Sequence, residues 1–274
     1  MISVLIPTRH HLATLPRAID SLRATAGGEI ELIVGIDDDD AETIAWAKQR
    51  SDIVRRVAPR PDTLGAVANR LAAEARGDLL LGLADDMEIL TPGWATAIEQ
   101  VAARVAPNGE PFAYYLNDPT HPGFPSVWGV NRSWIKICGF AAAPWFPYWW
   151  ADTWILEVGM ASGRLFRVEV ETAQIGGRGQ TTGMREIAWW AAFFERTRPY
   201  RLELALKIAR TVHPPDAYER LAAVMPEVGQ GLANMQASMK IVERAASLEA
   251  ALSPGEAPNE RYLRAKAAAE RFAP

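Results

Sequence analysis

Short apolar runs alternate with segments of helical spacing over the first hundred residues of the chain. Residues 2–6 form an apolar run that ends at Pro7, and residues 31–36 form another that ends at four consecutive aspartates. Runs of this length, bounded by Pro or by charge, are typical of buried strands. Between them, Leu12 to Ala26 places apolar residues three and four positions apart, which predicts a helix. This alternation indicates an α/β fold, a mainly parallel sheet flanked by helices.

The same patterns continue beyond the first two strands. Thr91 and Pro92 predict the start of a helix, because Thr is a common cap and Pro fits the first helical position. After Met184 the chain shows helical spacing to its end, with breaks at Pro199 and Pro214. Further strands are expected at residues 53–57, 79–84, 112–116, 126–130 and 165–170, and further helices at residues 41–50, 63–75, 131–137 and 152–162.

The chain divides into three parts that differ in residue composition and in the pattern of predicted elements. Residues 1–106 carry the alternation of strands and helices, whereas residues 107–198 are dense in Pro and aromatic side chains. Residues 199–274 form a helical C-terminal extension, in which apolar positions from Leu221 to Leu248 suit packing on a partner surface. We interpret this spacing as core packing or as a homo-oligomer contact.

Composition narrows the class of protein. The 274 residues carry a net charge of −4 and are 49% hydrophobic, so general affinity for nucleic acid or anionic membranes is not implied. The single cysteine, Cys138, excludes an internal disulfide. No apolar run reaches the roughly 20 residues of a membrane span, and the N-terminus lacks the features of a signal peptide. We therefore expect a cytoplasmic enzyme without a membrane span.

Acidic residues follow two of the predicted strands. Asp37 begins the run of four aspartates, and Asp85 and Asp86 follow residues 79–84. The carboxyl ends of parallel strands share one edge of a sheet, so these carboxylates are expected to converge and to attract a cation. They suit a divalent cation that holds a substrate phosphate, although a solvated turn is the alternative interpretation of Asp85 and Asp86. The sequence has no glycine-rich phosphate loop, which disfavours a dinucleotide dehydrogenase and a P-loop NTPase.

Five short motifs occur in a consistent order and spacing along the first hundred residues. They are Val4-Leu-Ile-Pro-Thr-Arg9, the acids after residues 31–36, Gly65-x-x-x-Asn69, Gly77-Asp78 and the acidic pair Asp85-Asp86. Together they resemble the family-2 glycosyltransferases of the GT-A fold, well over residues 1–100 and more weakly to residue 165. The resemblance implies a GT-A-like sheet with a helical C-terminal extension. Residues 1–106 would be its nucleotide-sugar-binding half, residues 107–198 its acceptor-binding half and residues 199–274 the extension.

The resemblance also implies a UDP- or GDP-sugar donor and the residues that bind it. Asp86 matches the second acid of the family's Asp-x-Asp motif, which coordinates Mg²⁺ or Mn²⁺ between the diphosphate oxygens. Ala84 stands at the first acid of that motif, so either Asp85 compensates or metal dependence is weakened. His213 and His121 are candidate further metal ligands, although a surface role is favoured for both. The residues expected at the donor are Pro7, Thr8, Arg9, Asp37, Arg60, Asn69 and Asp85, with Arg178 in a Gly-rich loop closing over the diphosphate.

One carboxylate further along the chain matches the family's catalytic base. Asp152 follows Gly139-Phe140 and an aromatic stretch, and it stands at the start of a predicted helix. A helix N-terminus would lower the pKa of this carboxyl and keep it ionised, as a base at neutral pH requires. The alternative is that Asp152 only caps the helix. Trp149 and Trp150, beside it, are the candidate acceptor-binding residues.

The resemblance implies transfer of a sugar from a nucleotide-diphosphate donor to an acceptor hydroxyl, with inversion, a metal ion and Asp152 as the base. Two other interpretations stay open. A catalytically impaired nucleotide- or glycan-binding protein is supported by Ala84. A sugar-nucleotide pyrophosphorylase shares the sheet layout, but Pro7-Thr8-Arg9 does not supply the Gly-rich signature of that class.

Overall fold

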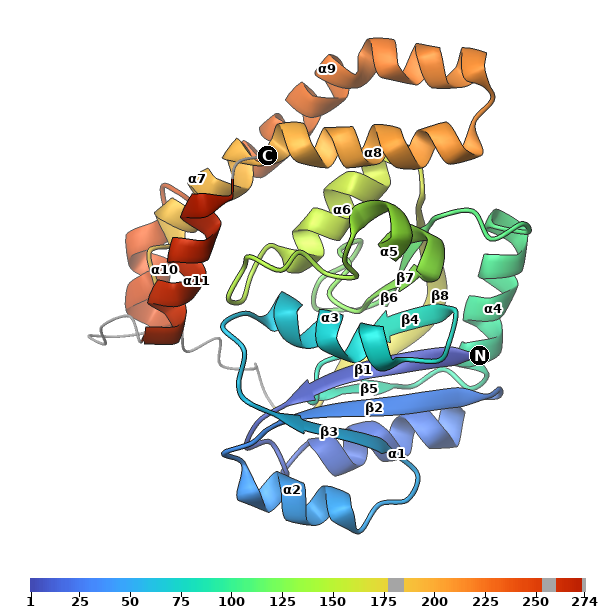
Figure 1. Cartoon of the computed structure of the whole chain (residues 1–274), viewed down its shortest axis with the longest axis vertical. Helices are drawn as coiled ribbons and strands as arrows, with labels where there is room; N and C mark the ends of the chain where they lie inside the picture. The colour runs from blue at the N-terminus through green and yellow to red at the C-terminus, as the bar shows by residue number, and fades with distance from the viewer. Residues whose placement is uncertain (177–184, 253–259, 273–274) are drawn as a thin grey trace.

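An eight-stranded sheet with the strand order β3-β2-β1-β4-β7-β6-β8-β5 organises the molecule (Figure 1). The computed structural model describes residues 1–176, 185–252 and 260–272. The strands are β1 (Ile2–Thr8), β2 (Ile30–Asp37), β3 (Val54–Ala58), β4 (Leu79–Gly82), β5 (Met87–Ile89), β6 (Ala113–Asn117), β7 (Trp128–Asn131) and β8 (Leu165–Gln174). The helices are α1 (Leu15–Thr25), α2 (Ala41–Lys48), α3 (Leu64–Glu74), α4 (Trp94–Val105), α5 (Arg132–Cys138), α6 (Ala151–Ser162), α7 (Ile187–Arg196), α8 (Arg198–Val212), α9 (Pro215–Ser238), α10 (Ala245–Leu252) and α11 (Glu260–Arg271).

The first four strands are parallel, and helices cover both of their faces. β1 pairs with β2 on one side and with β4 on the other, and β2 pairs with β3. Alternate side chains of a strand point to opposite faces, so Leu5 packs in one hydrophobic core while Val4 and Ile6 pack in the other. α3 covers the first face and α1 the second (Figure 1). Burial on both faces explains the continuous apolar runs, and the predicted α/β fold is confirmed.

The second half of the sheet mixes strand directions. β7 runs antiparallel between β4 and β6, and β8 pairs in parallel with β6. The strands predicted at residues 112–116, 126–130 and 165–170 are confirmed, although β8 continues to Gln174. The last residues of β8 pair antiparallel with β5, a three-residue strand that the sequence does not predict.

The strand predicted at residues 79–84 is shorter in the structure. β4 ends at Gly82, and residues 83–86 turn the chain toward β5. Gly82 allows the ring of Trp128 on β7 to approach, because a Cβ at this position would lie 2.5 Å from that ring. Asp85 and Asp86 therefore stand in a turn between two strands.

The helix start predicted at Thr91 and Pro92 is wrong. α4 begins at Trp94 after Gly93, whose φ of +76° is left-handed. The Thr91 hydroxyl is engaged elsewhere, because it accepts a hydrogen bond of 2.8 Å from the backbone N–H of Glu171 on β8. A tertiary contact thus takes the place of the local cap.

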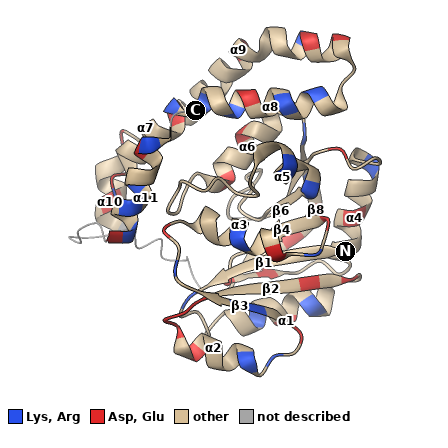
Figure 2. Ribbon diagram, viewed as in Figure 1, with Lys and Arg blue, Asp and Glu red and all other residues tan. Residues whose placement is uncertain are grey.

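The described residues after 184 are mainly helical, as predicted. α9 begins at Pro215, at a predicted break, but Pro226 lies inside that helix. α8 and α9 pack side by side, and the end of α11 lies near α7 and α8 in this view (Figure 1). Basic side chains are frequent along α11 (Figure 2). Within the described part of the chain, no helix combines the length and the apolar character needed to cross a membrane.

α6 is fixed in place by a buried ion pair. Glu157 of α6 and Arg201 of α8 are fully buried, with 2.7 Å between Oε2 and Nε. Arg201 also donates a hydrogen bond of 2.6 Å to the carbonyl of Phe194. Burial lowers the pKa of Arg201 to about 10. The pair joins α8 to α6, the helix whose first turn contains Asp152.

Candidate active site

A cavity of about 240 Å³ lies at the carboxyl ends of β1 and β4. Pro7 lines it from β1, Asp85 from the turn after β4, and Asp152 from the first turn of α6. Leu64 and Tyr148 line it as well. Ligands of open α/β sheets bind at this edge. The structure therefore brings predicted site residues from distant parts of the chain to one cavity.

The two adjacent acids Asp85 and Asp86 have different surroundings. Asp85 is buried, and its Oδ1 lies 2.8 Å from Nδ1 of His11. This hydrogen bond raises the pKa of His11. Asp86 is half-buried, and its Oδ2 accepts a hydrogen bond of 3.0 Å from Gln174 at the end of β8. Asp85, which the sequence suggested only as a helper, is thus the acid that lines the cavity.

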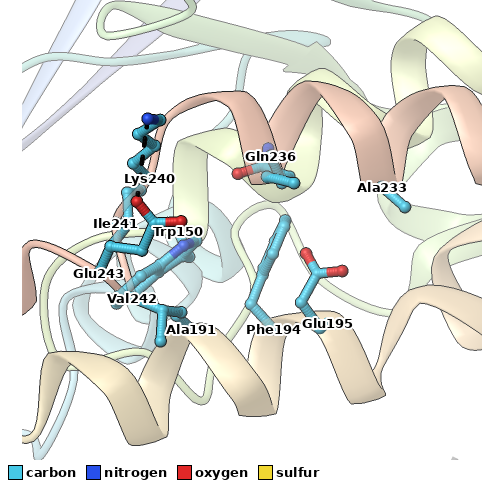
Figure 3. Close-up of a pocket in the computed structure, with 11 residues that line it drawn as sticks. Trp150, Ala191, Phe194, Glu195, Ala233, Gln236, Lys240, Ile241, Val242 and Glu243 are labelled. Carbon is cyan, nitrogen blue, oxygen red and sulfur yellow. Dashed lines mark ion pairs between the residues drawn. The ribbon is translucent and has the colours of Figure 1, made fainter.

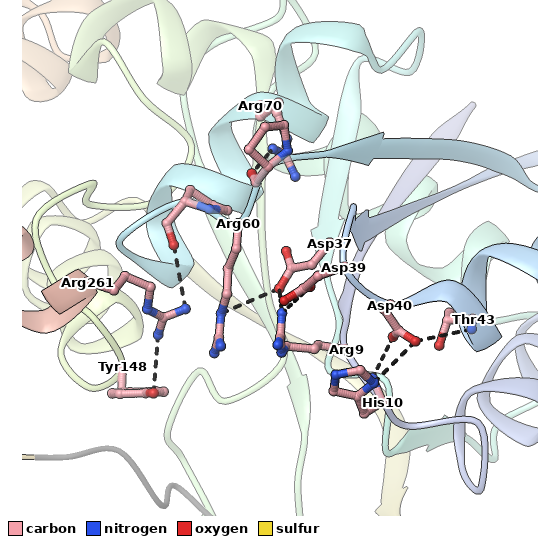
Figure 4. Close-up of polar contacts among 12 residues, drawn as sticks. Arg9, His10, Asp37, Asp39, Asp40, Thr43, Arg60, Arg70, Tyr148 and Arg261 are labelled. Carbon is pink, nitrogen blue, oxygen red and sulfur yellow. Dashed lines mark hydrogen bonds and ion pairs between the residues drawn. The ribbon is translucent and has the colours of Figure 1, made fainter. Parts of the chain in front are cut away.

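Arg9, Asp37 and Arg60 form a polar cluster at the same edge of the sheet (Figure 4). Oδ2 of Asp37 lies 3.2 Å from Nη1 of Arg9 and 3.4 Å from Nε of Arg60, and Arg9 also pairs with Asp39. Thr8, just before Arg9, is buried, and no group in the described part of the chain hydrogen-bonds its hydroxyl. A buried hydroxyl without a partner is unusual and suits a ligand atom. The predicted residues Arg9, Asp37 and Arg60 therefore form one cluster, and Thr8 precedes it at the end of β1.

The rest of the aspartate run has structural roles. Asp40 is the N-cap of α2 and accepts a hydrogen bond of 3.2 Å from the backbone N–H of Thr43. Its other oxygen accepts one of 2.6 Å from the backbone N–H of His10. Asp38 is exposed, and its N–H donates to the carbonyl of Ala58 at 3.1 Å.

The motif Gly65-x-x-x-Asn69 holds a loop rather than facing the cavity. The Asn69 side chain accepts hydrogen bonds from the N–H groups of Ala141 and Ala142, and it donates to the carbonyl of Ala142 at 2.8 Å. A Cβ at Gly65 would lie 2.1 Å from the carbonyl oxygen of Ala143. The expectation that Asn69 lies at the nucleotide is therefore not supported by its contacts. The motif instead clamps α3 to the loop that leads to α6.

Asp152 occupies the first turn of α6, but it is not the cap. The N-cap is Trp150, with a left-handed φ of +72° that is strained for a bulky residue. The Asp152 carboxylate accepts a hydrogen bond of 2.7 Å from the N–H of Thr153. Burial raises the pKa of Asp152 above its ordinary value. The predicted lowering of this pKa is wrong, because the desolvation of the carboxylate outweighs the helix terminus and its hydrogen bonds.

A second cavity, of about 330 Å³, adjoins Asp152 on its other side. Trp149 and Trp150, the predicted acceptor-binding residues, both line it, together with His121 and Arg244. Asp152 therefore lies between a cavity at the sheet edge and an aromatic cavity that the C-terminal helices help to close.

Trp150 also separates this aromatic cavity from a third one. Figure 3 shows that third cavity, of about 380 Å³, between α7 and the end of α9. Phe194 and Glu195 line it from α7, and Gln236 lines it from α9. The indole of Trp150 is 97% buried (3% exposed) and forms part of both walls.

Three predicted residues remain, two histidines and one arginine. His213 lines a shallow cavity with Met160 and Gly163, at the opposite end of α6 from Asp152, so the structure does not bring it to Asp86. His121 lies near Asp152 and pairs with Asp118, with 2.9 Å between Nδ1 and Oδ2. Arg178 lies outside the described residues.

The acids in the turn after β4 fit a shared metal ion rather than a preformed cage. Among the described residues, no group of three or more His, Cys, Asp and Glu side chains is arranged to hold a metal. Mg²⁺ is commonly bound by one or two carboxylates together with substrate phosphates. Asp85 and Asp86 could supply those carboxylates at the edge of the cavity.

Residues 3–106 match the sequence model of glycosyl transferase family 2. This segment is a family-2 glycosyltransferase domain. It contains the cluster of Arg9, Asp37 and Arg60, as well as Asp85 and Asp86. Asp152 and the aromatic cavity lie beyond the matched segment.

An uncharacterised protein of Sinorhizobium fredii, y4gI, is similar to part of the chain. It is 34% identical over 111 residues, which are 38% of this chain and 12% of that protein. The chain thus matches about an eighth of the length of this curated relative.

Solved structures resemble the chain over a longer stretch than the family-2 domain. S. aureus TarS residues 1–349, in complex with UDP-GlcNAc, has a TM-score of 0.55 at 13% identity and covers 83% of this chain and 72% of that one. A mycobacterial protein has a TM-score of 0.52 at 14% identity and covers 71% of this chain and 74% of its own. At this identity the likeness concerns the fold, which is GT-A-like.

Sequence reasoning missed His11 as a partner of Asp85. The only feature of the sequence that points to His11 is its position just after the motif that ends at Arg9, at the edge of the sheet where ligands bind. Reasoning along the sequence also missed Arg261 of α11, which hydrogen-bonds Tyr148 at the cavity. No motif marks that arginine.

Proposed function

We propose that the chain is a glycosyltransferase that moves a sugar from a nucleotide-diphosphate donor to an acceptor hydroxyl. The observation that carries the proposal is the cavity at the edge of the sheet, which Asp85 of the family-2 domain and Asp152 of α6 line together. A UDP- or GDP-sugar is the donor class. The fold likeness to TarS, a protein solved with UDP-GlcNAc, supports this choice.

In this proposal the nucleoside lies against β1 and β2. The Thr8 hydroxyl, which has no hydrogen-bond partner among the described residues, is available to a ligand. The cluster of Arg9, Asp37 and Arg60 adds guanidinium donors and a carboxylate acceptor at the strand ends. Asp86 and Asp85 would hold Mg²⁺ or Mn²⁺ at the diphosphate. The chemistry that such an ion supplies is neutralisation of the charge on the leaving diphosphate.

Asp152 is the base of the proposed reaction. Its carboxylate takes the proton of the acceptor hydroxyl as the hydroxyl oxygen forms a bond to the anomeric carbon. The bond from that carbon to the diphosphate oxygen breaks on the opposite face, and the electron pair leaves with the nucleoside diphosphate. The configuration at carbon is therefore inverted. A raised pKa makes this carboxylate a better proton acceptor than an exposed one.

The acceptor side of the proposal is the aromatic cavity. Trp149 and Trp150 line it next to Asp152, and indole rings present large apolar faces with a polar edge. Such rings suit a hydroxylated ring or chain as the acceptor. Transfer of a hexosyl group, a cytoplasmic location and a homo-oligomer through the C-terminal helices stay predictions of the sequence.

Titration of UDP and GDP, with and without Mn²⁺, tests the donor half of this proposal. We expect metal-dependent binding of one nucleotide and hydrolysis of the matching nucleotide sugar, with both weakened by Asp86→Ala. Glu88→Ala is a matched control, because this nearby acid pairs with Arg17 on α1 instead. Absence of nucleotide binding by the native chain would contradict the proposal.

A catalytically impaired nucleotide-binding protein is the second candidate. Ala84 offers no ligand atom, and His11 already engages Asp85, so the turn presents fewer free carboxylate oxygens than an Asp-x-Asp motif. Nucleotide binding that ignores metal and Asp86→Ala, without any transfer or hydrolysis, would favour this candidate.

A further inference from the structure

The C-terminal helix α11 reaches the edge of the donor cavity. Nη2 of Arg261 donates a hydrogen bond of 3.2 Å to the hydroxyl of Tyr148, which lines that cavity. Nη1 of Arg261 donates to the carbonyl of Pro61 at 3.5 Å, across 200 positions of sequence. Arg261 therefore joins the loop after β3 to the loop before α6.

The packing of α11 holds Arg261 at this place. Tyr262, Ala265 and Ala269 are buried on the inner face of the helix. Exposed Arg264 pairs with Asp62 at 2.9 Å, and half-buried Lys266 pairs with Glu186 at 2.5 Å. The helix is thus anchored along the positions that follow Arg261, from Tyr262 to Ala269.

Arg261 extends a row of positive charge. Figure 4 shows the guanidinium groups of Arg261, Arg60 and Arg9 in line between Tyr148 and Asp39. Burial lowers the pKa of Arg60, and the positive charges of Arg261 and Arg9 lower it further. Arg9 and Arg60 have carboxylate partners, whereas no carboxylate among the described residues forms an ion pair with Arg261. Like charges gathered in this way repel one another unless an anion lies among them.

We propose that Arg261 binds the diphosphate of the donor, so that the C-terminal helix completes the donor site. The proposal rests on the glycosyltransferase function proposed above. A guanidinium group matches two phosphate oxygens with parallel hydrogen bonds. Its hydrogen bond to Tyr148 places it beside a residue that lines the cavity. Because Asp37 and Asp39 already pair with Arg9 and Arg60, Arg261 is the arginine of this row whose charge is available to a diphosphate. A nucleoside without phosphates would gain nothing from Arg261.

Calorimetric titration with UDP and with uridine tests this inference, or with GDP and guanosine if the chain prefers guanine. We expect Arg261→Ala to weaken UDP binding about tenfold or more, the effect of losing charge-assisted hydrogen bonds, and to leave uridine binding unchanged. Arg261→Lys should recover part of the loss, because the charge remains. Tyr148→Phe should give a smaller loss than Arg261→Ala, since it only releases the guanidinium from its hydroxyl contact.

Arg264→Ala is the matched control, because this arginine lies on the same helix and pairs with exposed Asp62. It should leave binding of both ligands close to the native values. Native-like UDP binding by Arg261→Ala would overturn the inference, and so would an equal loss of UDP and uridine binding, which indicates a structural role only. If the native chain binds neither UDP nor GDP, the proposed function fails first and this inference with it.

Discussion

The family-2 domain and the helices beyond it contribute to the candidate site in different ways. Residues 3–106 present side chains from strand ends. Arg9 follows β1, Asp37 is the last residue of β2, and Asp85 lies in the turn after β4. The later region places Asp152 and Arg261 by packing, one on a helix held by a buried ion pair and one on a helix anchored near the C-terminus. Site residues at strand ends belong to short motifs that can be recognised in a sequence. The position of a packed helix depends on many residues that are far apart in the sequence.

This contrast predicts that the later region depends on its buried ion pair. Arg201→Ala removes the closest partner of the buried Glu157 carboxylate and leaves only Arg198, whose Nε lies 3.8 Å away, and we expect a loss of about 3 kcal/mol in the free energy of unfolding. Thermal and denaturant unfolding measure the effect. The double variant with Glu157→Leu and Arg201→Met should lose less, because both charges of the buried pair are removed and Arg198 keeps its pair with Glu195. Equal stability of Arg201→Ala and the native chain would show that the pair does not hold α6.

A smaller effect is expected where the two regions are clamped together. Gly65→Ala would force a methyl group against the carbonyl of Ala143, and we expect a loss of about 1–3 kcal/mol in stability together with lower transfer activity. Gly231→Ala on α9 is the matched control, since a Cβ there meets nothing within 4 Å. That substitution should be neutral or stabilising. If both variants behave alike, the clamp does not position the loop before α6.

The same contrast explains which predictions from the sequence hold. The parallel strands are predictable, because apolar periodicity is a local feature. The grouping of Arg9, Asp37 and Arg60 at one site follows instead from the resemblance to family-2 glycosyltransferases. β5 and the cap of α4 are not predictable from the sequence, because both depend on contacts with β8. β5 is a three-residue strand that pairs with β8, and the Thr91 hydroxyl accepts a hydrogen bond from Glu171 of β8. The clamp role of Asn69 and the raised pKa of Asp152 arise from loops and burial that only the tertiary structure sets.

The smallest expected effect is a shift in pH dependence. Burial raises the pKa of Asp152, so this carboxylate becomes protonated at a higher pH than an exposed aspartate does. As pH is lowered, the rate of transfer should therefore begin to fall at that higher pH. The rate falls rather than rises because the base must be ionised, and the ionised carboxylate is lost by protonation as pH drops through the raised pKa. A profile of transfer rate against pH, with donor and acceptor saturating, measures it. A rate that stays constant into the ordinary aspartate range would contradict the buried base.

The most direct measurement compares donor binding and sugar transfer in Asp152→Asn. This substitution keeps the shape of the side chain and removes the proton acceptor. We expect nucleotide affinity close to that of the native chain and a rate of transfer lower by about 10²–10⁴-fold, the usual contribution of a general base. Transfer at the native rate, or loss of nucleotide binding together with transfer, would contradict Asp152 as the base between the two cavities.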